Sequence, residues 1–151
     1  MIRRRDSERG SGLVELALGL SFLTLLFVAL VQLALGVVTY GQLREAVDRA
    51  ALFAATDSIA EPATAYLERV KHVAVYGHPE LEERGGTAGL ELSQVQVEIL
   101  RDSKGAPQAV EVRIEGYGMP LAWQGELLKL APASVVNYRG RWMPAGLIGQ
   151  P

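Results

Sequence analysis

The chain contains no cysteine. This absence excludes disulfide bonds, thiolate metal sites and a cysteine nucleophile, but it does not identify the compartment. Common catalytic signatures are also missing, because the sequence has no G-x-x-x-x-G-K-S/T phosphate loop, no H-E-x-x-H and no G-x-S-x-G. We therefore expect a protein that is not an enzyme, binds no cofactor and acts on no small-molecule substrate.

Charged residues are absent from residues 16–43, a run of 28 residues within a chain of 151. Residues 44–151 carry eleven Lys or Arg against fourteen Asp or Glu. A weakly acidic domain of this kind does not favour nucleic acid as a partner. A single apolar run followed by only 108 further residues also excludes a polytopic transporter and a two-lobed enzyme.

The uncharged run predicts a membrane helix. At about 1.5 Å per residue, residues 16–43 would form a helix about 42 Å long, whereas the hydrocarbon core of a bilayer is about 30 Å thick. A cleaved secretory signal has a shorter apolar region, so we expect this helix to stay attached to the protein as a membrane anchor. Four arginines precede the run and its far flank, residues 44–49, is balanced. The positive-inside rule then places the N-terminus in the cytoplasm and residues 44–151 outside.

Glu15 stands at the start of this apolar stretch, where a carboxylate is costly. One interpretation is an interfacial Glu that is stabilised by the positive end of the helix dipole. However, Gly10 lies five residues earlier, directly after Arg9, at the end of a basic leader. A leader, a Gly, four small or apolar residues, a Glu and a long apolar helix are the layout of a prepilin-peptidase signal.

The stretch from Arg9 to Ala55 resembles the TadE-like pseudopilins of the tight-adherence (Tad/Flp) type IV pilus system. The matching features are Gly10, Val14 and Glu15, then the apolar helix, then an Ala- and Arg-rich segment over residues 44–55. The resemblance covers roughly residues 3–56. The chain departs from the family at Leu16, where an aromatic residue is usual.

The resemblance implies a domain plan and a mechanism. Residues 1–10 would be a prepilin leader that is cleaved between Gly10 and Ser11. Residues 11–56 would form the transmembrane and spine helix, and residues 57–151 a small periplasmic domain. The new amine of Ser11 would pair with Glu15 of a neighbouring subunit or of its own chain, because each charge alone is penalised in a low dielectric.

The family also implies partners and a location. The partners would be other pilin and pseudopilin subunits, a prepilin peptidase, an inner-membrane assembly platform and the lipid bilayer. The protein would be a minor pilin or pseudopilin of the bacterial inner membrane, with its C-terminal domain in the periplasm or in an extracellular pilus. The alternatives are a generic single-pass anchored accessory or binding protein and, less favoured, a membrane-tethered enzyme. Tip initiator, minor subunit and assembly factor all fit.

Apolar spacing predicts that one helix runs from about residue 12 to residue 56. Its outer part carries an apolar stripe with helical periodicity, and i,i+4 ion pairs are expected between residues 44 and 48 and between 45 and 49. A second helix is expected from Pro62 to Tyr76 and should end at Gly77. The stripe residues are Leu43, Val47, Ala50, Ala51 and Ala54 on the first helix, and Tyr66, Leu67, Val70, Val73 and Ala74 on the second.

Alternating residues predict a small antiparallel sheet of about three strands. Two strands should centre on Val97 and Val112 and form a hairpin across the loop RDSKGAPQ, with a third over residues 134–142. Residues 126–130 are ambiguous, with a short helix as one interpretation. The fold class is therefore α+β, and the resemblance implies that the arrangement is pilin-like.

Two further sets of side chains are expected to bind no ligand. The aromatic residues Trp123, Tyr138 and Trp142 suit the core or an interface better than a ligand cage. His72 and His78 match no usual ligand spacing, so we expect no metal site.

Overall fold

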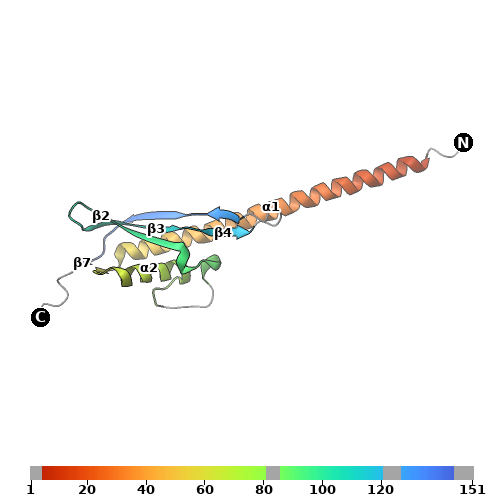
Figure 1. Cartoon of the computed structure of the whole chain (residues 1–151). Coiled ribbons are helices and arrows are strands. Elements are labelled where there is room, and N and C mark those ends of the chain that lie inside the picture. The colour runs from red at the N-terminus through yellow and green to blue at the C-terminus, as the bar shows by residue number, and fades with distance from the viewer. Residues whose placement is uncertain (1–4, 81–85, 121–126, 145–151) are drawn as a thin grey trace. The chain divides into compact units, whose positions relative to one another are not determined.

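The computed structural model describes residues 5–80, 86–120 and 127–144, and it confirms an α+β fold (Figure 1). The chain divides into two compact units, one up to Val37 and one from Val38 onward. In chain order the elements are α1 (Arg5–Thr56), β1 (Ile59–Ala60), α2 (Thr64–Tyr76), the 3-10 turns η1 (Thr87–Gly89) and η2 (Leu92–Gln94), β2 (Val95–Arg101), β3 (Pro107–Ile114), β4 (Tyr117–Pro120), β5 (Leu127–Leu130), β6 (Ala133–Asn137) and β7 (Trp142–Met143).

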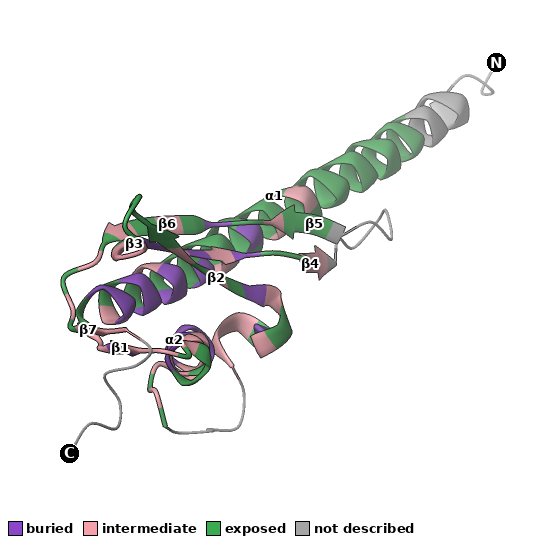
Figure 2. Cartoon of the chain, turned by 60° about the vertical axis from the view of Figure 1, so that its left-hand side comes forward, coloured by how far each residue is buried: buried purple, intermediate pink, exposed green. Residues whose placement is uncertain are grey.

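Helix α1 ends at Thr56, as expected, but it begins at Arg5, seven residues before the predicted start. Figure 2 shows the change in exposure along its coloured part, from mostly exposed residues to a last third in which many residues are buried. Every large apolar side chain from Leu13 to Leu35 is at least 37% exposed within the chain. Such a surface is stable only against apolar surroundings.

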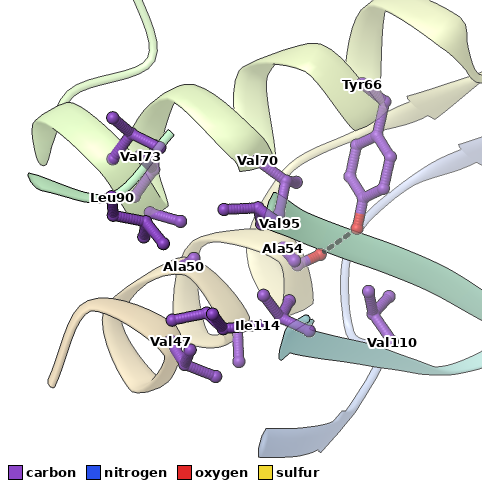
Figure 3. Close-up of a cluster of buried hydrophobic side chains, with 14 of the residues drawn as sticks. Val47, Ala50, Ala54, Tyr66, Val70, Val73, Leu90, Val95, Val110 and Ile114 are labelled. Carbon is purple, nitrogen blue, oxygen red and sulfur yellow. Dashed lines mark hydrogen bonds between the residues drawn. The ribbon is translucent and has the colours of Figure 1, made fainter. Parts of the chain in front are cut away.

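The outer part of α1 forms the centre of the second unit's core. The five predicted stripe residues of α1 are confirmed, because each is 0% exposed. Figure 3 shows Val47, Ala50 and Ala54 facing side chains from α2 and the sheet. On the polar face, the predicted pair between Arg44 and Asp48 is present at 3.8 Å.

The second predicted pair, between Glu45 and Arg49, is not among the ion pairs of the described residues. The guanidinium of Arg49 lies beside Gly77 instead. The Arg49 side chain thus lies close to the end of α2.

Helix α2 begins at Thr64, two residues later than predicted. Its first internal hydrogen bond runs from the N–H of Leu67 to the carbonyl of Ala63 at 3.0 Å, which leaves Pro62 outside the helix. The end at Gly77 is confirmed. Gly77 adopts φ 79°, which favours glycine, and its N–H donates to the carbonyl of Val73. The predicted apolar stripe of α2 is buried except for the half-buried Leu67.

The predicted hairpin is confirmed as β2 and β3, with Val97 opposite Val112. Asp102 holds the loop between them, because its Oδ1 accepts the N–H groups of Lys104 and Ala106 at 2.9 and 2.8 Å. Strand β6 pairs with the other side of β3, so the sheet order is β2-β3-β6 and all neighbours are antiparallel.

The third predicted strand, residues 134–142, is two strands in the structure. Strand β6 ends at Asn137, and β7 pairs in parallel with β1. The chain leaves the sheet because the N–H of Arg139 bonds to the carbonyl of Ala55 at the end of α1. A Cβ at Gly140 would collide with the carbonyl of Asp57, so only glycine fits this crossing.

The short-helix interpretation of the ambiguous residues 126–130 is wrong for residues 127–130. Leu127–Leu130 form β5, which pairs with β4 and places Met119 opposite Leu128 and Tyr117 opposite Leu130. Cross-strand apolar pairs of this kind stabilise a two-stranded ladder. Pairing with β4 therefore makes residues 127–130 a strand. Residue 126 and Trp123 lie outside the described residues.

Candidate functional site

The candidate site predicted from the sequence lies on the first unit, where Glu15 is an exposed carboxylate on an apolar helix. Gly12 precedes it by three residues and Gly19 follows by four, so both flank Glu15 on the same face of α1. A Cβ at either glycine would meet no atom within 4 Å. With Leu16, Leu20 and Leu23, these residues form an open apolar hollow around the carboxylate.

The candidate cleavage bond between Gly10 and Ser11 lies inside α1, because the helix begins at Arg5. Helix is intrinsically weak at this point. Gly10 and Gly12 flank Ser11, and each glycine costs about 1 kcal/mol relative to alanine in a helix interior. The helix is therefore locally less stable around this bond than an alanine-rich segment would be.

Between Gly12 and Thr56, α1 is long and apolar enough to cross a bilayer. Its most apolar window of 18 residues has a mean hydropathy of 2.4 and is 6% buried within the chain. The hydroxyl groups in this region also suit an apolar setting. Ser21 donates to the carbonyl of Ala17 at 2.9 Å and Thr24 to that of Leu20 at 2.8 Å. Neither hydroxyl needs a partner outside the helix.

The two histidines lie in separate local contacts. His72 on α2 stacks edge-on against Tyr76, with ring centroids 5.6 Å apart. His78 accepts the N–H of Glu80 through Nδ1 at 3.3 Å. Over residues 5–80, 86–120 and 127–144, no three side chains of the ligating types gather into a metal site. The expectation that the protein binds no metal stays a prediction.

A polar corner at the end of α1 could not be predicted from sequence spacing. Both Nε and Nη2 of Arg69 bind Oδ2 of Asp57, at 3.0 and 2.8 Å. The hydroxyl of Tyr138 accepts the N–H of Ile59 and lies 3.0 Å from the carbonyl of Asp57. The Tyr66 hydroxyl donates to the carbonyl of Ala54 at 2.7 Å. These bonds join α1, α2 and the crossing after β6, and their partners are too far apart in sequence for spacing to reveal them.

Burial also perturbs both tyrosines of this corner. It raises the pKa of the Tyr66 phenol well above its ordinary value. The phenolate form of Tyr138 and the carboxylate of Asp57 raise this pKa further, and Arg69 lowers it by a smaller amount. The pKa of Tyr138 is raised mainly by burial as well. Both phenols are neutral hydrogen-bonding groups at physiological pH, which makes this corner a structural joint.

Comparisons of the chain with protein-family models, with curated proteins and with solved structures found no match. A functional proposal must therefore rest on the residues and geometry of this chain.

Proposed function

We propose that the protein is a minor pilin or pseudopilin of a Tad-type pilus or a related secretion machine. It would be processed by a prepilin peptidase and assembled through its N-terminal helix. The observation that carries the proposal is one continuous helix, Arg5–Thr56, which bears Gly10 and Glu15 at its start and a buried stripe at its end. The same element could enter a membrane at one end and organise a folded domain at the other.

The position of Glu15 supports this proposal over a plain anchor. A carboxylate in an apolar helix costs free energy, and the cost is lowest where a positive group can pair with it. The glycines at 12 and 19 leave its surroundings open, so a second helix can approach the carboxylate closely. Cleavage after Gly10 would create the amine of Ser11 four residues before Glu15. A generic anchored accessory protein is the second candidate, and it needs neither Gly10 nor Glu15 at this spacing.

The mass of the membrane-extracted protein tests the proposal. In cells that express a cognate prepilin peptidase, we expect a mature chain that begins at Ser11. Replacing Gly10 with a bulky residue, as in Gly10→Leu, should make the precursor accumulate. Gly12→Leu is the matched control, because it changes a neighbouring glycine that has open space around it. A mature chain that still begins at Met1 would favour the generic anchor.

A further inference from the structure

The second unit has an open groove between the last turns of α1 and strand β6. Its volume is about 410 Å³. The residues that form it are Leu52, Ala55 and Thr56 of α1, Val135, Val136 and Asn137 of β6, and Arg139. Two of these are large apolar side chains that remain strongly exposed, since Leu52 is 64% and Val135 is 57% exposed.

The backbone of β6 presents hydrogen-bonding groups to this groove. The N–H of Tyr138 donates to the carbonyl of Gln108, and the N–H of Ile114 donates to the carbonyl of Pro132. The even-numbered residues of β6 therefore face β3, and the odd-numbered ones point their N–H and C=O groups away from it. Arg139 is the next odd-numbered residue, and its N–H donates to the carbonyl of Ala55 and not to β3. In the part of the chain that the structure describes, residues 133, 135 and 137 have no such partner.

The two edges of the sheet differ in how they are protected against strand addition. Strand β2 carries Glu98 and Arg101 and has a register shift between Leu100 and Arg101. Charges and bulges of this kind discourage a further strand. Strand β6 has no charged residue over 133–138, and its register with β3 is regular. The edge that borders the groove is thus the open one.

The charge at the groove defines what can bind there. Arg139 is the one charged residue that lines it, and it is exposed. The ion pairs between described residues include neither Arg139 nor the exposed Arg141 that follows it. Arg139 therefore makes its part of the groove positive, and the other residues that form the groove are uncharged.

We propose that this groove docks an extended segment of a partner protein, which adds a strand to β6 and places acidic side chains beside Arg139. Main-chain hydrogen bonds to residues 133, 135 and 137 would hold the segment, and Leu52 and Val135 would take its apolar side chains. An antiparallel strand makes the stronger ladder, so the acidic residues would stand at the segment's N-terminal end. This proposal does not depend on leader cleavage or on Glu15.

A defined peptide tests the proposal on the full chain in detergent. The probe is a short blocked, fluorescent peptide in which two glutamates precede alternating threonine and valine. We expect saturable binding by fluorescence anisotropy. Arg139→Glu should weaken binding about tenfold or more and should shift the preference to a peptide with lysines in place of the glutamates. Lys104→Glu at the hairpin tip is the control, since it changes an exposed cation that does not line the groove and should leave the affinity unchanged.

A second variant tests the hydrogen bonds to the β6 edge separately from the charge of Arg139. Val135→Pro removes an outward N–H that does not bond to β3, so binding should be lost while the thermal unfolding midpoint stays near that of the parent. No binding by the parent, or equal binding by the Arg139→Glu variant, would overturn the proposal. So would a disulfide-linked dimer of a Val135→Cys variant in this cysteine-free chain, because it would assign the edge to a second copy.

Discussion

At the scale of single residues, Glu15 and Tyr66 depend on their surroundings in opposite ways. Glu15 is exposed on an apolar surface, and the role proposed for it needs a positive partner, which would be the new amine of Ser11. Tyr66 is 1% exposed and already has its partner, the carbonyl of Ala54. A substitution should therefore affect assembly in the first case and folding in the second.

We expect Glu15→Gln to leave membrane insertion and leader cleavage intact and to reduce incorporation into pili or secretion complexes. The amide keeps the size of the side chain but removes the charge that would pair with the amine of Ser11, and a neutral residue enters the apolar phase more easily. Fractionation and co-purification with partner subunits measure both steps. Glu45→Gln, a change of the same kind on the outer part of α1, is the control. Normal assembly of the Glu15→Gln protein would contradict the proposed role.

Tyr66→Phe should lower the free energy of unfolding by about 1–2 kcal/mol at pH 7, because the buried carbonyl of Ala54 loses its donor. The sign of the pH effect follows from the raised pKa of the phenol. Its stabilisation is fully present below about pH 10, the pKa of an unfolded tyrosine, and is lost as pH rises further.

Denaturant unfolding of a soluble fragment, residues 42–151, at pH 7 and at pH 11 checks both parts of the Tyr66 prediction. The parent fragment should lose more stability between these pH values than the Tyr66→Phe variant. Some alkaline sensitivity should remain in the variant, because the pKa of Tyr138 is raised too. An equal loss in the two proteins would show that the Tyr66 phenol is not the responsible group.

At the scale of elements, the outer part of α1 is a component of the folded domain. Its five stripe residues are fully buried, and its last carbonyls bind Tyr66 and Arg139. A fragment of residues 60–151 should therefore be unfolded or nearly so, whereas residues 42–151 should fold. Exposing about 200 Å² of apolar surface costs about 5 kcal/mol, which is comparable to the whole stability of a small domain.

Thermal unfolding of the two fragments by circular dichroism decides this point. We expect a cooperative transition for residues 42–151 and a weak or absent one for residues 60–151. Equal midpoints would mean that the domain folds independently of α1 and that residues 44–56 only separate it from the membrane.

At the scale of the whole molecule, the charge distribution predicts its orientation. The natural chain has no cysteine, so a single introduced cysteine can be labelled without background. Lys104→Cys at the hairpin tip should react with a membrane-impermeant maleimide in cells with a permeabilised outer membrane. Ser7→Cys in the leader should react only after the inner membrane is opened, in cells without the peptidase. Labelling of Ser7→Cys before that step would reverse the predicted topology.

The sequence by itself determined the features that depend on local spacing. The uncharged run, the α1 stripe, the end of α2 at Gly77 and the β2–β3 hairpin all follow from neighbouring residues, because apolar periodicity and turn residues act within a few positions. The α+β class followed from those elements. The candidate residues Gly10, Ser11 and Glu15 could also be identified from the sequence, because the hypothesis about them rests on their spacing before the apolar run.

Only the tertiary structure decided the features that join distant segments. The third strand divides at Arg139 because the end of α1 accepts its N–H, and residues 127–130 become a strand because β4 offers a ladder. The Asp57–Arg69 pair, the Tyr138 joint and the open edge of β6 likewise arise between elements. Pattern within a segment cannot predict them, because the free energy of each comes from a partner that packing alone brings within reach.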